Sequence, residues 1–182
     1  MTNAIAGISD HAGWAVVVCV ANGKVINRRR IELLGPGLPS LPYHHDAQGL
    51  PTDEAEALIE RVRQSAALFA ANTLAALPAN VKAIAIRKRP PLPATVAERI
   101  ADYWAQTRAD GVMYRDVLAE AAQARGWSVV EYEVKTVFQE AAQALGIDDI
   151  FPRLGEIGKA LGPPRQKDHR LAAAAAMAAS KS

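Results

Sequence analysis

The sequence predicts an α/β fold in which one five-stranded mixed sheet is covered by helices on both faces. Three observations support this fold class. The first 33 residues contain three β-rich runs, two of them joined by Asn22-Gly23, a dipeptide typical of a tight β-hairpin. The first two runs are apolar at consecutive positions, which is typical of strands buried on both faces. Two more β-rich runs follow, each after a long helical pattern.

The first three strands are expected at residues 4–9, 14–21 and 24–33, as an antiparallel meander. Residues 35–51 then contain four prolines and three glycines without any periodicity, so they predict a long loop. This Pro/Gly-rich loop carries His44, His45 and Asp46. Their composition resembles that of a metal cluster; the alternative is that adjacent histidines in such a loop face the solvent.

A helix and a short strand come next. Asp53 and Glu56 have the spacing of a capping box and precede an apolar stripe, so we expect a helix at residues 53–77. The apolar run at residues 81–87 predicts a short buried strand, which ends before Pro90-Pro91.

Two helices are expected between the fourth and fifth strands. Thr95 and Glu98 form a second capping box, which begins a helix that reaches residue 107. Asp110-Gly111 predicts a break, and a further helix then extends to Arg125, with Gly126 as its C-terminal cap.

The last strand is expected at residues 127–134, and helices follow at 135–145, at 147–161 and, rich in alanine, from about residue 167. Because strand-helix-strand crossovers are right-handed, this element order predicts the sheet order 3-2-1-4-5. That is the order of the ribonuclease H-like fold. We expect residues 1–182 to form a single domain of this kind.

Composition excludes several classes of protein. A single cysteine among 182 residues leaves no disulfide framework and no Cys-x-x-Cys metal cluster. The longest apolar run, at residues 14–21, is far shorter than the roughly 20 residues of a membrane span, and no signal peptide is recognisable. We therefore expect a soluble, cytoplasmic protein. The formal charge of +2 is too small to indicate nucleic-acid binding by itself.

In the predicted topology, the bend after the first strand, the end of the fourth strand and the start of the last helix meet at one edge of the sheet. Asp10 lies in the first of these places, and Asp168 in the third. Carboxylates there can hold divalent ions that activate water for phosphodiester hydrolysis. We therefore take Asp10 and Asp168 as candidate catalytic residues and metal ligands, with His169 as a further candidate metal ligand.

Each of these residues also has a simpler interpretation. Asp10 can be a turn residue whose side chain caps its own backbone. Asp168 can be the N-cap of the last helix, and His169 a solvated residue in its first turn.

Two stretches of the chain carry a resemblance to a known family. Gly7-Ile8, then Asp10 and Gly13-Trp14-Ala15-Val16, resemble the opening motif of RuvC-type Holliday-junction resolvases. Residues 122–146, AQARGWSVVEYEVKTVFQEAAQALG, are similar to the resolvase segment in which a helix ends in Ala-Arg-Gly, a strand follows and Val-Lys opens the next helix. The resemblance implies a nuclease that uses Mg²⁺ or Mn²⁺, acts on DNA or RNA and forms a homodimer.

The chain departs from this pattern at three positions. Ser9 is interposed before Asp10, Arg87 stands where the resemblance places a glutamate, and Leu171 replaces a second acidic residue in the last helix. An arginine cannot ligate a metal ion. Two hypotheses follow: a metal-dependent endonuclease, or a catalytically degenerate relative that binds nucleic acid or a protein. A third, weaker hypothesis is an interaction subunit that dimerises through its alanine-rich helices.

Basic residues near the presumed site could bind phosphates. The candidates are Arg87, Lys88, Arg89, Lys135 and Lys167, with Arg165 beside the last. The alternative is a solvated charged surface. Alternation along a strand places Arg29 on the opposite face from Arg28 and Arg30, so these three form a weaker patch. The large aromatic residues Trp14, Trp104, Trp127 and Tyr132 are expected to pack between layers of the fold.

Overall fold

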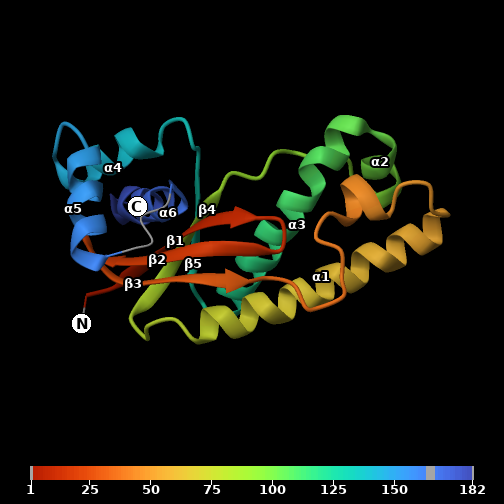
Figure 1. The fold of residues 1–182 in the computed structure, drawn as a ribbon, viewed down its shortest axis with the longest axis horizontal. Helices are drawn as coiled ribbons and strands as arrows, with labels where there is room; N and C mark the ends of the chain where they lie inside the picture. The colour runs from red at the N-terminus through yellow and green to blue at the C-terminus, as the bar shows by residue number, and fades with distance from the viewer. Residues whose placement is uncertain (1, 163–166, 182) are drawn as a thin grey trace.

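A single five-stranded mixed sheet forms the centre of the computed structural model, which describes residues 2–162 and 167–181. Its strands are β1 (Ala4–His11), β2 (Trp14–Ala21), β3 (Lys24–Glu32), β4 (Val81–Arg87) and β5 (Ser128–Tyr132). Their order, β3-β2-β1-β4-β5, confirms the prediction. β1, β2 and β3 pair antiparallel, whereas β4 and β5 run parallel to β1 (Figure 1).

Helices cover both faces of the sheet, as predicted (Figure 1). One face is covered by α1 (Thr52–Ala75) and α3 (Tyr103–Ala124), with the short α2 (Val96–Ala101) beside them. The other face is covered by α4 (Val137–Leu145), α5 (Phe151–Leu161) and α6 (Lys167–Ala178). Two short helical segments complete the secondary structure of the described residues: a π-helix, η1 (Pro42–Asp46), and a 3-10 helix, η2 (Ala179–Lys181). No helix within the described residues has the length and hydropathy needed to cross a membrane.

Alternation along β1 separates the two cores. Ala4, Ala6 and Ile8 belong to the core beneath α1 and α3, whereas Gly7 faces α6. A Cβ atom at position 7 would collide with the backbone of Ala172, so only glycine allows α6 to lie this close to β1. The buried alanines of α6 permit the same close approach from the helix side. This contact places the first turn of α6 over the end of β1.

β1 is two residues longer than predicted. Asp10 pairs with Ala15 and His11 pairs with Trp14 in the ladder between β1 and β2. The turn is therefore only Ala12-Gly13, in which Gly13 adopts a φ of 83°. Asp10 is a strand residue, so the interpretation of Asp10 as a turn residue was wrong.

The helices differ from the prediction in several places. The helix expected to reach residue 107 ends at Ala101, and α3 begins at Tyr103. The capping box at Thr95 and Glu98 is confirmed, but α1 begins after Pro51 without any side-chain cap, so the box at Asp53 was wrong. α3 also continues through Asp110, where a break was predicted. The Asp110 carboxylate is buried and accepts the backbone N–H groups of η1, from Tyr43 at 2.9 Å and from His44 at 3.0 Å. Asp110 thus attaches the Pro/Gly-rich loop to the helix instead of ending it.

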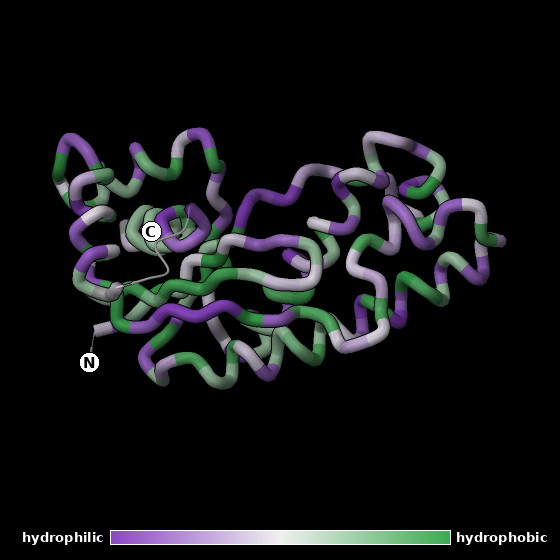
Figure 2. The backbone as a smooth tube through the Cα atoms, viewed as in Figure 1, coloured by the Kyte–Doolittle hydropathy of each residue, from purple (hydrophilic) through white to green (hydrophobic). Residues whose placement is uncertain are grey.

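The hydrophilic side chains of the sheet are concentrated on β3. Figure 2 shows β1 and β2 as largely hydrophobic and β3 as strongly hydrophilic along its middle. β3 is an edge strand and carries Arg28, Arg29 and Arg30. Charged side chains on an edge strand oppose pairing with strands of other molecules.

Candidate functional site

The candidate site lies where β1 and β4 end and α6 begins. Alternation sends consecutive residues of β1 to opposite faces of the sheet. Ile8 is in the core beneath α3, and Asp10 follows it on that side. Ser9 and His11 face α6, on the same side as Gly7. The two predicted carboxylates therefore approach the end of β1 from different sides.

Asp168 is bound by the α6-facing residues of β1. Its Oδ1 atom accepts hydrogen bonds from Ser9 Oγ at 2.8 Å and from His11 Nε2 at 2.9 Å. Burial alone would raise the pKa of the Asp168 carboxyl, but the hydrogen bonds from His11 and Ser9, with the nearby charge of Arg87, hold that pKa below its usual value. Asp168 is therefore an ionised carboxylate with one oxygen already engaged twice.

Asp10 is almost completely buried and is bound by arginines. Its Oδ2 atom accepts a hydrogen bond of 2.8 Å from Arg115 Nε in α3. Arg87 Nε forms a longer ion pair with Asp10 Oδ1, at 3.8 Å. Asp10 Oδ1 and Arg87 Nε are both buried, and neither has a hydrogen-bond partner among the described residues. Two guanidinium groups thus face one carboxylate and more than balance its charge.

Arg87 is the residue between the two carboxylates. Arg87 pairs in register with Tyr132 and follows Ala85 by two residues on β4. Both Tyr132 and Ala85 lie in the core beneath α6, so the Arg87 side chain leaves the strand on the α6 side of the sheet. From there it pairs with Asp10 and also acts electrostatically on Asp168. A positive charge therefore stands where the resemblance places a metal-binding glutamate.

These residues do not fit the pair of divalent ions that the fold family implies. A guanidinium repels a dication and cannot ligate it. Within residues 2–162 and 167–181, no group of three or more His, Cys, Asp or Glu side chains is placed to share an ion. The structure does not bring Asp10, Asp168 and His169 together as one ligand set. It places His169 near Arg28, and burial and that arginine lower the pKa of the His169 imidazole.

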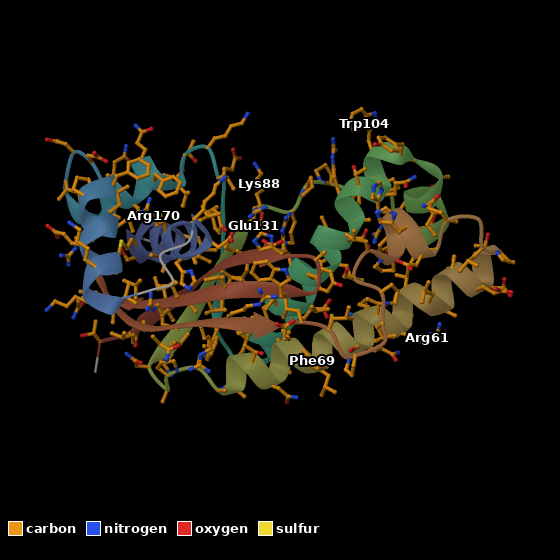
Figure 3. All side chains as sticks on the ribbon, in the orientation of Figure 1. Arg61, Phe69, Lys88, Trp104, Glu131 and Arg170 are labelled. Carbon is orange, nitrogen blue, oxygen red and sulfur yellow. The ribbon has the colours of Figure 1, made fainter. Side chains whose placement is uncertain are left out.

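Most of the predicted basic residues are engaged with acidic partners. Lys88 Nζ lies 2.7 Å from Glu133, and Arg89 lies 2.6 Å from Glu131 and 3.0 Å from Asp116. Figure 3 shows Lys88 and Glu131 at the same end of the sheet. The remaining candidates, Lys135 and Lys167, are exposed, and Arg165 lies outside the described residues.

A second set of contacts, not anticipated from the sequence, extends the site along β2 and β3. His11 stacks on Trp14 with ring centroids 4.1 Å apart and an interplanar angle of 7°. The guanidinium of Arg30 lies over the same indole ring, 4.0 Å from its centroid. Alternation along β1 would have identified Ser9 and His11, had the strand been predicted at its full length.

The aromatic residues behave as predicted with one exception. Trp127 and Tyr132 are buried in the cores, but Trp104 is 67 % exposed, so its assignment to the packing between layers was wrong. Trp104 lies at the far end of the molecule from α6 (Figure 3). There it contacts Tyr103, which contacts His44 in turn.

Comparisons with known proteins concern the fold. No protein-family model and no curated protein sequence matches the chain. RuvC of T. thermophilus in complex with a Holliday junction substrate matches 98% of this chain and 92% of its own, with a TM-score of 0.55 and 15% identity. A second RuvC structure from Thermus thermophilus matches 97% and 92%, with a TM-score of 0.53 and 14% identity. The chain therefore has the ribonuclease H-like fold in the form seen in RuvC.

Proposed function

We propose that the chain is a RuvC-like protein that binds nucleic acid at the ends of β1 and β4 and does not cleave it by two-metal chemistry. One observation carries this proposal: Arg87 occupies the end of β4 and pairs with Asp10. The RuvC structure in complex with a Holliday junction supports nucleic acid as the ligand, because that protein shares this fold over nearly the whole chain.

The chemistry of the charged groups favours binding over hydrolysis. Two-metal hydrolysis needs carboxylates that hold the cations which activate water and stabilise the leaving oxygen. Here the carboxylates of Asp10 and Asp168 are opposed by the guanidinium groups of Arg87 and Arg115 and by the imidazole of His11. A guanidinium presents its N–H donors directly to phosphate oxygens and needs no metal ion to do so.

The predicted phosphate-binding residues contribute unequally in this proposal. The Arg87 side chain is 32% exposed, so part of it is accessible to a ligand, although its Nε atom is buried and faces Asp10. Lys135 and Lys167 are exposed. Lys88 and Arg89 must first leave their acidic partners, so they add less binding free energy. A homodimer, which the resemblance implies, would present two such surfaces.

Binding and cleavage are tested separately. Fluorescence anisotropy with a labelled four-way junction, a duplex and a single-stranded RNA, all in EDTA, should detect binding that weakens as salt rises. Incubation of the same substrates with Mg²⁺ or Mn²⁺ should give no cleavage. Arg87→Ala should weaken binding, whereas Arg63→Ala should not, because Arg63 is an exposed arginine in ion pairs on α1.

Two outcomes would contradict the proposal. Absence of binding to all three ligands would remove nucleic acid as the partner. Metal-dependent cleavage that is lost in both Asp10→Asn and Asp168→Asn would establish the endonuclease alternative, with Mg²⁺ or Mn²⁺ as its cofactor.

A further inference from the structure

The face of β3 that is turned toward α6 carries a second group of basic residues. Arg28 and Arg30 pair in register with Val18 and Val16 of β2. Both valines belong to the core beneath α6, so the two arginines lie on the α6 side of the sheet. Arg29 lies on the opposite face, beside Cys19. The three consecutive arginines therefore supply two charges to the α6 side.

Arg30 is linked to the candidate site by direct contacts. Its guanidinium lies on Trp14, Trp14 stacks on His11, and His11 is hydrogen-bonded to Asp168. The contact with Trp14 holds the guanidinium in one orientation although the side chain is 58% exposed. An arginine that is already oriented loses less conformational entropy when it binds a phosphate.

The first turn of α6 adds further positive charge to the same side. Lys167 and Arg170 are exposed, and Figure 3 shows Arg170 on this helix. His169, in the same turn, lies near Arg28 of β3, and burial together with the charge of Arg28 lowers the pKa of its imidazole. The N-terminus of a 12-residue helix also favours a negatively charged ligand through its dipole.

The charge balance distinguishes this surface from the end of the sheet at β4 and β5. There the basic residues Arg87, Lys88, Arg89 and Arg115 are all in ion pairs with the acidic residues Asp10, Asp116, Glu131 and Glu133. On the α6 side, Arg30 pairs with Glu32, and Asp168 is paired with His11. Within the described residues, Lys167 and Arg170 have no ion pair. An excess of positive charge therefore lies toward β3 and α6.

The aromatic residues near this surface leave no place for a base to stack. Both faces of Trp14 are covered, by His11 on one side and by Arg30 on the other. Tyr132, which faces the same side of the sheet, is 3% exposed. A nucleic acid on this surface would therefore be recognised through its phosphates and not through stacking of its bases.

We propose that Arg28, Arg30, Lys167 and Arg170, named here the β3–α6 surface, bind the phosphate backbone of a nucleic acid duplex without reading its sequence. This inference rests on the proposed function and specifies the path of the ligand. From Arg87 the backbone passes Asp168 and continues toward β3, away from the acidic residues at the ends of β4 and β5.

The experiment measures anisotropy with two labelled duplexes of unrelated sequence, in EDTA, over a range of salt concentrations. Arg30→Ala/Arg170→Ala should weaken binding to both duplexes equally. It should also reduce the slope of log K against log salt by about 1.8, since each phosphate contact contributes about 0.9. Arg61→Ala/Arg63→Ala removes the same charge from α1, across the sheet, and should change neither quantity.

Arg170→Ala alone provides a second test that does not disturb the stack on Trp14. It should reduce the slope by about 0.9. If the two double variants weaken binding equally, or if Arg170→Ala binds as tightly as wild type, the β3–α6 surface is overturned and the proposed function stands. Strong discrimination between the two duplex sequences would overturn recognition through the backbone. Absence of wild-type binding would overturn both proposals.

Discussion

Arg115 Nε donates a hydrogen bond of 2.8 Å to Asp10 Oδ2 and so joins residues that are 105 positions apart in the chain. The side chains of Arg115 and Asp10 are 12% and 3% exposed, and their contact links the end of β1 to the middle of α3. Because a buried carboxylate without a partner is costly, this pairing makes Asp10 part of the framework of the fold.

The ion pair between Arg115 and Asp10 predicts that removing Arg115 greatly reduces the stability of the fold. Arg115→Ala should lower the free energy of unfolding by about 3–5 kcal/mol, because it leaves the buried carboxylate of Asp10 with only its longer contact to Arg87. Urea denaturation followed by circular dichroism measures this change. Arg108→Ala, at an exposed position of the same helix, is the control. Equal stability of the two variants would show that Arg115 does not neutralise Asp10.

The close contact between β1 and α6 predicts that a methyl group added at Gly7 lowers the stability of the protein. Gly7→Ala should destabilise the protein by about 1–3 kcal/mol, because its Cβ would displace the backbone of α6 at Ala172. Gly155→Ala is the matched control, since a Cβ there meets no atom within 4 Å. Thermal unfolding compares the two variants. If Gly7→Ala were as stable as Gly155→Ala, the close packing of α6 on β1 would be disproved.

The hydrogen bonds to Asp168 predict a pH dependence. Its pKa is lowered in the native state, so its contribution to stability is present above the unfolded pKa of about 3.9 and is lost as pH falls through the native value. Asp168→Asn should therefore have a lower melting temperature than wild type at pH 7. The difference should shrink as pH falls through the native pKa of Asp168. A difference that persists unchanged in acid would contradict the lowered pKa.

The two hydrogen bonds from η1 to Asp110 predict a local opening. An asparagine at this position retains one acceptor oxygen and would present its amide group to the second backbone N–H. Asp110→Asn should therefore increase hydrogen exchange at the Tyr43 and His44 amides. Asp116→Asn, on the same helix and paired with Arg89, should leave these amides protected. Unchanged protection in Asp110→Asn would show that η1 is held by other contacts.

Much of the fold is predictable because its signals are local. The hairpin dipeptide Asn22-Gly23 and the apolar runs around it identify the meander, and helical periodicity identifies the crossovers that set the strand order. The predicted break at Asp110-Gly111 was wrong. The unfavourable free energy of glycine in a helix can be predicted locally. The hydrogen bond from Tyr43 to the Asp110 carboxylate joins α3 to a loop that is distant in the sequence, so no local pattern indicates it.

The candidate site is less predictable, because it depends on register and on distant partners. Two extra residues of β1 decide that Asp10 lies in the strand and that Ser9 and His11 face Asp168. The parallel register of β4 and β5 brings Arg89 to Glu131, which no local pattern in the sequence indicates. Arg115 lies in another element altogether, with no motif that connects it to Asp10.

The central claim is that guanidinium groups and hydrogen-bond donors occupy the carboxylates that would otherwise hold divalent ions. A Mn²⁺ titration followed by electron paramagnetic resonance tests it most directly, because free Mn²⁺ gives the observed signal and bound Mn²⁺ does not. We predict that the wild-type protein leaves the free Mn²⁺ signal unchanged at millimolar concentrations. Stoichiometric loss of that signal in wild type, abolished by Asp168→Asn, would contradict the account and establish a metal site.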